Sequence, residues 1–252
     1  MRWAGLEGSR AAYLRRDNPN LQYLLAGRAA WMNQWIDPHH DSGVELGCGM
    51  GYSKDFIRAR EFRLTDIQHL PWVDVPGVDA MATPFESASL DFVVASNMIH
   101  HVAQPLRFFD EVARILKPGG RLLVQDMHAS LATRMLLTAM RHENYSFDVN
   151  VFDPSSICND PNEPWSANCA VPSMLFRHTG RFEAAVPQFE LVSRRYTEFF
   201  TWLNSGGVNA KTFYLPLAPS LLRLAGWLDR ILTSIAPHIF AMEMQVVLRK
   251  RA

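Results

Sequence analysis

Three glycines at alternate positions, Gly47, Gly49 and Gly51, are the residues of this sequence that point most directly to chemistry. They follow a short apolar run, and a helix-compatible segment, residues 52–60, comes after them. Glycine permits a sharp turn and a close approach of the backbone to a ligand, because it has no Cβ. Asp66 ends a second short strand about twenty residues further on, where a nucleotide-binding βαβ unit places its ribose-binding carboxylate. The pair predicts a cofactor site made of backbone and one carboxylate.

A dinucleotide is the first alternative for this cofactor. The fingerprint for NAD or FAD has its third glycine at the position that Tyr52 occupies here. The glycines of this chain are evenly spaced instead, so that a neutral or zwitterionic tail could lie over the turn as well as a pyrophosphate. The turn by itself leaves both possibilities open.

Further motifs follow at definite intervals: Gly-Val-Asp-Ala at 77–80, Thr-Pro-Phe at 83–85, the run 90–97, a histidine pair at 100–101 and the run 116–124. In this order and spacing they resemble the class I S-adenosylmethionine-dependent methyltransferases, and within them the broad small-molecule group that includes quinone and sterol methylating enzymes. The resemblance covers roughly residues 43–126. The resemblance is specific for the cofactor and the fold, but it indicates almost nothing about the acceptor.

The resemblance implies S-adenosyl-L-methionine as the cofactor and assigns roles at the carboxyl ends of the strands, where open α/β sheets bind ligands. Asp66 accepts from the ribose hydroxyls, Asp79 accepts from the adenine amino group, and Glu45 orients the turn and the amino group of the cofactor. Cys48 fills the turn and is not a nucleophile, since nothing basic stands beside it in sequence to lower its pKa. The predicted cofactor-binding residues are Glu45, Gly47, Cys48, Gly49, Gly51, Asp66, Ile67, Asp79, Ala80 and Asn97.

Four residues are candidates for catalysis: His100, His101, Asp126 and His128. Positioning supplies most of the acceleration of methyl transfer, but a hydroxyl acceptor also needs a base for its proton. His128, paired with Asp126, is the preferred base, because it lies just past the fifth strand and histidine titrates near neutrality. His101 is expected to shape its turn.

Composition limits the other possibilities. A formal net charge of zero and a pI near 7.1 argue against a nucleic-acid partner. Three cysteines, an odd number, favour reduced thiols and a cytoplasmic setting, and the first residues lack the apolar core of a signal peptide. Metal-capable side chains, among them His142 and Glu143, show no zinc-ligand spacing, so no required metal is expected.

The elements that must position these residues alternate between strand and helix, which predicts a doubly wound, Rossmann-like α/β fold. Apolar spacing predicts an N-terminal helix ended by Asp37-Pro38, and the resemblance implies seven strands, the last one antiparallel. The predicted domains are a helical cap (1–42) and a methyltransferase domain (43–252), with an insertion at about 128–186. The expected helices are 20–36, 108–116 and 130–141, and the expected strands 43–46, 62–66, 73–78, 90–95, 121–125, 189–199 and 242–249.

Two segments are expected to contact the acceptor. The helix 20–36 and the irregular stretch 150–168 should close over it, since long irregular segments are usually lids or binding loops. Nearby residues that could line a pocket are Trp165, Asn168, Tyr196 and Phe200.

An apolar helical face at residues 221–232 predicts packing or a homodimer contact, with peripheral membrane or lipid-linked acceptor contact as the alternative. The predicted function is O-methylation of a small molecule, a saccharide or secondary metabolite. C-methylation of a quinone-like or lipid-linked compound is the alternative, and a non-catalytic binding module is the alternative of another class.

Overall fold

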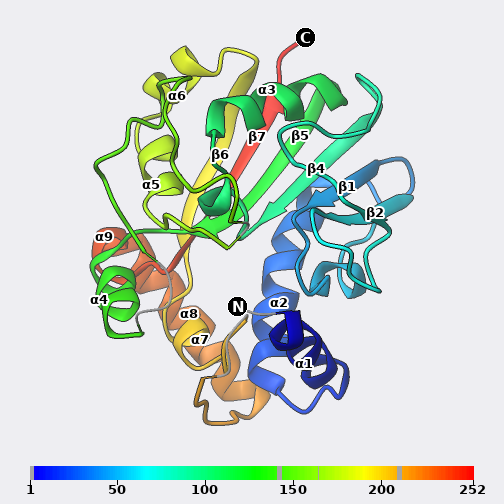
Figure 1. Ribbon diagram of the computed structural model, residues 1–252. Helices are drawn as coiled ribbons and strands as arrows, with labels where there is room; N and C mark the ends of the chain where they lie inside the picture. Colours follow the sequence, from blue (N-terminus) through cyan, green and yellow to red (C-terminus); the bar gives the residue numbers. More distant parts are fainter. Residues whose placement is uncertain (1–2, 141–143, 164, 209–211) are drawn as a thin grey trace.

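The computed structural model describes residues 3–140, 144–163, 165–208 and 212–252, and in this part of the chain one seven-stranded sheet forms the centre of the molecule (Figure 1). Its strand order is β3-β2-β1-β4-β5-β7-β6, and β7 runs antiparallel to both of its neighbours. The predicted Rossmann-like fold is confirmed. The strands are β1 (Ser42–Leu46), β2 (Glu61–Asp66), β3 (Val75–Pro76), β4 (Leu90–Ser96), β5 (Leu116–Met127), β6 (Phe189–Thr197) and β7 (Glu243–Lys250).

Helices cover both faces of this sheet, and several gather beyond its carboxyl edge, below the sheet in Figure 1. The predicted N-terminal helix begins after Asn18, whose side chain accepts from the Leu21 amide at 3.0 Å, and it continues as a 3₁₀ turn to Trp35. The helices are α1 (Trp3–Leu14), α2 (Pro19–Met32), α3 (Pro105–Ile115), α4 (Leu131–Met140), α5 (Val171–Phe176), α6 (Thr179–Ala185), α7 (Phe200–Leu203), α8 (Pro219–Ile235) and α9 (Pro237–Phe240).

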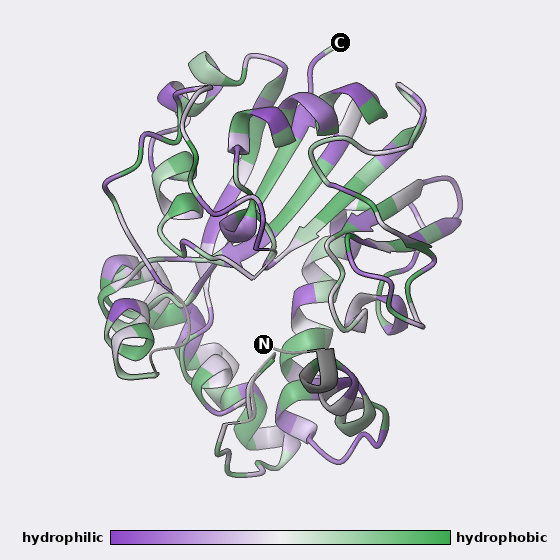
Figure 2. Ribbon diagram, in the orientation of Figure 1, coloured by the Kyte–Doolittle hydropathy of each residue, from purple (hydrophilic) through white to green (hydrophobic). Residues whose placement is uncertain are grey.

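Alternating side chains of the central strands divide the core into two layers. Val93 packs with Phe108 and Phe109 of α3 on one face of the sheet, whereas Phe92 and Val94 face α2 on the other. Figure 2 shows the central strands as hydrophobic along most of their length. Strands buried on both faces are continuously apolar in this way, which is why the sequence marked β4 so clearly.

Three predicted elements need correction. The segment after the glycines, residues 52–60, forms only a short 3₁₀ turn (Tyr52–Asp55), because Phe56 leaves helical geometry and Ile57 packs beneath α2. The third strand is limited to two residues, since Pro76 has no N–H with which to extend the ladder. The fifth strand begins at Leu116, five residues earlier than predicted, through an irregular register opposite Leu90.

Helices α1, α5, α6, α7 and α9 were not predicted. The first of them covers the outer side of the glycine turn: Arg10 donates to the Met50 carbonyl and lies over the Trp72 ring. Among the described residues, no helix is long and apolar enough to cross a membrane. The domain boundaries stay predictions.

Candidate functional site

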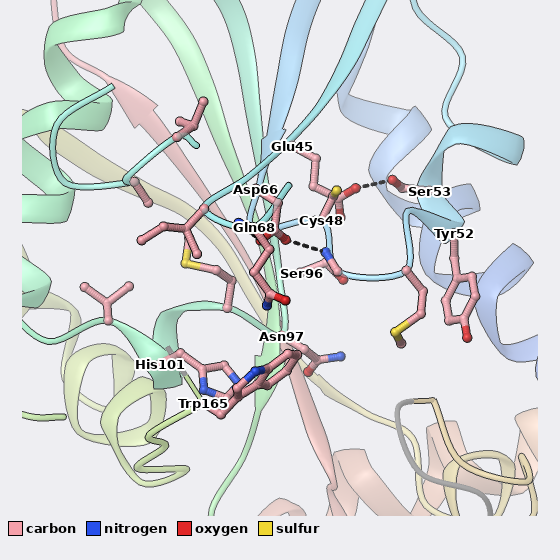
Figure 3. Close-up of a pocket in the computed structure, with 18 of the residues that line it drawn as sticks. Glu45, Cys48, Tyr52, Ser53, Asp66, Gln68, Ser96, Asn97, His101 and Trp165 are labelled. Atoms are coloured by element: carbon pink, nitrogen blue, oxygen red, sulfur yellow. Dashed lines mark hydrogen bonds between the residues drawn. The ribbon is translucent and has the colours of Figure 1, made fainter. Parts of the chain in front are cut away.

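A cavity of about 230 Å³ opens at the carboxyl ends of β1, β2 and β4. Figure 3 shows Glu45, Asp66, Asn97 and His101 around it, with Trp165 beside His101. Other parts of the wall come from the inner face of α2 and from Asp160, Pro161, Glu163 and Trp165. The cavity therefore lies where the first strands of an open α/β sheet are expected to bind a ligand.

Nine of the ten predicted cofactor-binding residues line this cavity. The tenth, Gly51, faces away from it: a Cβ there would lie 2.7 Å from Leu64 Cδ1 and 3.0 Å from Trp72 Cδ1. Gly51 is needed for the turn, because its φ of 65° is left-handed and its surroundings leave no room for a side chain. The lining residues among the predicted set are Glu45, Gly47, Cys48, Gly49, Asp66, Ile67, Asp79, Ala80 and Asn97.

Gly49 is the point at which the backbone itself faces the cavity. Its φ is 50°, and no described atom lies within 4 Å of the position that a Cβ would take. Its N–H donates to Asp66 at 2.8 Å, and its carbonyl accepts from the Trp72 indole at 2.8 Å. The peptide is thus held from both sides while the space above it stays open for a ligand.

Replacing Gly49 with alanine should weaken cofactor binding about ten- to a hundredfold, since a methyl group in a closely packed site costs about 1–3 kcal/mol. Gly119 is the matched control, because it also has a positive φ, 77°, and open space around its Cβ position, but lies outside the cavity. Both variants should lose about 1–2 kcal/mol of stability through the left-handed backbone. Calorimetric titration of both with S-adenosylhomocysteine decides the point, and equal affinities would contradict it.

Asp66 and Ile67 line the cavity at the carboxyl end of β2. Each Asp66 carboxylate oxygen accepts one backbone amide, from Gly49 at 2.8 Å and from Gln68 at 2.9 Å, and burial raises the pKa of this carboxyl. A carboxylate oxygen has a second lone pair, so both can still accept from a ligand diol. Ile67 is 50% exposed, which leaves an apolar surface for a flat ring. These residues fit a nucleoside.

Glu45 and Cys48 lie under the turn. Burial raises the pKa of Glu45 to about 8, and Ser53 donates a hydrogen bond to its carboxylate. A positively charged ligand group would favour the ionised form of Glu45. Burial also raises the pKa of the Cys48 thiol, which keeps it protonated and fits the predicted role as a filler of the turn.

Asn97 holds the end of the cavity nearest α2 from a left-handed backbone, with a φ of 51°. Its amide satisfies its neighbours when the nitrogen donates to Glu243, at 3.0 and 3.2 Å, and the oxygen accepts from Arg28 Nη1 at 2.9 Å. Arg28 also binds Glu198 through two hydrogen bonds, at 2.8 and 2.6 Å, and pairs with Glu243 at 3.2 Å. This buried cluster fixes the Asn97 side chain from both sides.

The cluster extends into the sheet through two glutamines. Gln125 donates to Glu243 at 3.0 Å and accepts from Gln245 at 2.7 Å. Burial raises the pKa of Glu243 to about 7, although the charge of Arg28 opposes the shift. Two buried carboxylates therefore share one guanidinium. No local pattern could predict this arrangement, because its members are up to 215 positions apart in the chain, from Arg28 to Glu243.

Of the four catalytic candidates, His101 lines the cavity. Its Nδ1 lies 3.0 Å from the Ser166 carbonyl oxygen, and Trp165 packs against the ring edge-on. A carbonyl can only accept, so Nδ1 carries the proton and, in the neutral ring, Nε2 carries the lone pair. That tautomer is the one required of a base acting through Nε2.

His100 and Asp126 form a buried pair beside the cavity and not in its wall. Their Nδ1 and Oδ1 atoms are 2.5 Å apart, and Asp126 Oδ2 accepts from the Ile99 amide at 2.8 Å. The pair braces the 3₁₀ turn Ile99–His101 that follows β4. Asp126 is therefore paired with His100, and the expected pairing with His128 is wrong.

His128 lies behind the cavity wall. Its Nδ1 is 2.9 Å from Ser173 Oγ, and its ring packs 4.5 Å from that of Tyr196. Burial, with smaller electrostatic effects of neighbours that include Arg194 and Arg134, lowers its pKa to about 4. This position does not support the predicted role as base.

Several other lining residues were not predicted from the sequence. Arg28, Ser53, Gln68 and Ser96 reach the cavity, and a polar residue next to a strand end was the only available signal for the last two. Trp165 lines the cavity as predicted, whereas Asn168, Tyr196 and Phe200 do not.

Both proposed lid segments contribute to the wall, one through α2 and the other through Asp160, Pro161, Glu163 and Trp165, but their closure stays a prediction. Among the described residues no group of three His, Cys, Asp or Glu side chains is placed to hold a metal. His142 and Glu143 lie outside the described residues, and the expectation of no required metal stays a prediction.

Comparison with known proteins agrees with this geometry. Residues 48–124 match a family described as a methyltransferase domain. A probable S-adenosylmethionine-dependent methyltransferase of Mycobacterium tuberculosis is 34% identical over 92 residues, which cover 32% of this chain and 34% of that protein. A demethylmenaquinone methyltransferase of Renibacterium salmoninarum is 30% identical over 90 residues, which cover 36% of this chain and 35% of that protein. The chain thus spans about a third of the length of the curated relatives that it matches.

The fold has a counterpart among solved structures. A SAM-dependent methyltransferase from Archaeoglobus fulgidus superposes with a TM-score of 0.55 at 15% identity, over 90% of this chain and 93% of that chain. The predicted resemblance is confirmed: residues 48–124 match a methyltransferase domain, and the similar Mycobacterium tuberculosis protein is named as a probable S-adenosylmethionine-dependent methyltransferase.

Proposed function

We propose that this chain, with its S-adenosylmethionine-dependent methyltransferase domain, methylates a hydroxyl group of a small-molecule acceptor, a saccharide or a secondary metabolite. The observation that carries the proposal is the single cavity that joins the glycine turn and Asp66 to His101. A cofactor held by the glycine turn and Asp66 has its reactive end directed towards His101.

The fit of the cofactor follows from the residues already described. Asp66 accepts from the ribose hydroxyls, Ile67 covers the adenine, and Asp79 accepts from the adenine amino group. Glu45 attracts the positive charges of the methionine part. S-adenosyl-L-methionine supplies an electrophilic methyl group when it is bound.

His101 is the base of this proposal. Its Nδ1–H is held by the Ser166 carbonyl, so Nε2 takes the proton of the acceptor hydroxyl as the oxygen attacks. Asn97, held between Arg28 and Glu243, keeps the facing wall rigid. Pro161 and Trp165 exclude water from the acceptor side.

A lipid-linked or quinone-like acceptor, methylated at carbon, is the second candidate. One observation favours it: α8 presents an apolar face to solvent, with Leu224 and Trp227 each 50% exposed. The name of the Renibacterium relative points in the same direction.

Asp66→Ala should weaken the binding of S-adenosylhomocysteine by about 1–3 kcal/mol, because ligand hydroxyls lose a charged acceptor in a closed site. Calorimetry of the wild-type protein and the variant measures this, with NAD as the ligand that should not bind. Asp74→Ala is the matched control, an aspartate that pairs with Lys54 at the surface and does not line the cavity. A protein that bound NAD but neither S-adenosylhomocysteine nor S-adenosyl-L-methionine would overturn the proposal. A protein that bound both compounds but methylated no saccharide, secondary metabolite, quinone-like or lipid-linked acceptor would be a non-catalytic binding module.

A further inference from the structure

Helix α8 buries two polar side chains and leaves several of its apolar side chains exposed to solvent. Its buried positions include Asp229, which is 4% exposed, and Thr233. Leu221, Leu224 and Ile235 lie on the solvent side, and Ile235 is 77% exposed. Leu222 of the same face is buried, so the predicted packing is observed for only part of this face.

This orientation is fixed by hydrogen bonds. Asp229 accepts from the Phe200 amide at 2.8 Å, the Thr201 amide at 3.1 Å and the Thr201 hydroxyl at 2.5 Å, so it caps the start of α7. On the same helix, Gly226 lets Tyr23 of α2 approach, since a Cβ there would lie 2.6 Å from the tyrosine hydroxyl oxygen. Rotating α8 to bury its leucines would bring a carboxylate into solvent at the loss of all three bonds.

Positive charge borders the apolar face. Arg223, Trp227 and Arg230 follow one another at helical spacing, and all three are exposed. Neither arginine forms an ion pair with a described residue. Asp229, the one acidic residue of α8, is buried, so the outward side of this helix carries no negative charge.

The apolar surface continues beyond α8 at both ends. Phe213, 88% exposed, and Leu215 precede the helix, in a segment held in place because Asn20 and Asn204 donate to the Leu215 carbonyl. Ile239 of α9, also exposed, follows it. In Figure 1, α8 runs along the lower left edge of the molecule, with α9 and α4 at its carboxyl end.

We propose that the outward face of α8, with Phe213 and Leu215 before it, docks on the surface of an anionic lipid bilayer. An apolar stripe bordered by arginines and free of exposed acids is the pattern of a helix lying in the membrane interface. Lipid phosphates and anionic headgroups would neutralise Arg223 and Arg230, while the leucines and Trp227 enter the acyl boundary. Because α8 contacts α2, which lines the cavity, docking brings the cavity close to acceptors in the lipid phase.

This inference goes beyond the proposed function and is tested without methyl transfer. The full-length protein is sedimented with vesicles of phosphatidylcholine alone, or of an equimolar mixture of phosphatidylcholine and phosphatidylglycerol. We expect binding to the anionic vesicles, weaker binding at high salt, and little binding to the neutral ones. The emission of Trp227 should shift to the blue on binding, and the shift should be lost in Trp227→Phe.

Two variants and a control locate the surface. Leu224→Glu should weaken vesicle binding about tenfold or more, and the double variant Arg223→Ala/Arg230→Ala about thirtyfold. Leu14→Glu, at a leucine of α1 that is 57% exposed, should bind as the wild type does. All these positions are exposed, so thermal unfolding should be unchanged and serves as the check on folding.

Failure of the wild-type protein to bind anionic vesicles would overturn the proposal, as would undiminished binding by Leu224→Glu. A dimer in sedimentation velocity that Leu224→Glu dissociates, without vesicle binding, would assign the face to a second copy of the chain. Retained cofactor binding in any of these cases leaves the proposed function standing.

Discussion

Replacing His101 with alanine should lower turnover by about 10²–10⁴-fold, the usual loss when one positioned base is removed. The affinity for S-adenosylhomocysteine should stay within about twofold, since the residues that fit the nucleoside, Asp66 and Asp79, are untouched. Single-turnover kinetics at saturating cofactor, with calorimetry on the same protein, separate the two quantities. The effect requires an acceptor with a proton to lose.

His128→Ala is the matched control for this experiment. Its ring is buried behind the cavity wall with a pKa lowered to about 4, so the variant should keep turnover even if it loses some stability. His100→Ala should act mainly through stability, because it leaves the buried carboxylate of Asp126 without its imidazole partner. Loss of turnover in His128→Ala, with His101→Ala active and folded, would identify His128, after β5, as the base. Full activity in all three would favour positioning alone.

Arg28→Met should lower the free energy of unfolding by about 3–5 kcal/mol at pH 8, the typical cost of removing one partner from a buried ion pair. The variant leaves Glu198 and Glu243 buried without their shared cation. Urea denaturation at several pH values measures the loss. Arg121→Met is the matched control: its pair with Asp41 is partly exposed, and its removal should cost no more than about 1 kcal/mol.

The loss in Arg28→Met should depend on pH in a definite direction. Burial already raises the pKa of Glu243 to about 7 from its ordinary 4.5, and loss of the arginine raises it further. At pH 5 the Glu243 carboxyl of the folded variant keeps its proton, so little uncompensated charge is buried. As the pH rises towards 8, the unfolded chain holds fewer protons than the folded one, and stability falls. A loss that is the same at pH 5 and pH 8 would contradict the account of a shared cation.

The sequence determined the cofactor half of this protein. Continuous apolar strands such as β4 are recognised because both of their faces are buried, and Gly49 and Asp66 are recognised because each lies next to the strand end that places it. The position of a residue that directly follows a strand can be predicted without knowledge of distant contacts. For this reason the central strands followed from local pattern, and nine of the ten residues that the resemblance placed around the cofactor line the cavity.

Tertiary structure alone decided the rest. Asp126 could pair with either histidine near the strand ends, and only the path of the chain after β4 brings His100 to it. Arg28 meets Glu243 because α2 packs against β7, a contact that no local pattern encodes. The apolar stripe of α8 was visible in the sequence, but which side faces solvent was not. Three hydrogen bonds to Asp229 set that direction, because burying a carboxylate without them would cost more than exposing the leucines.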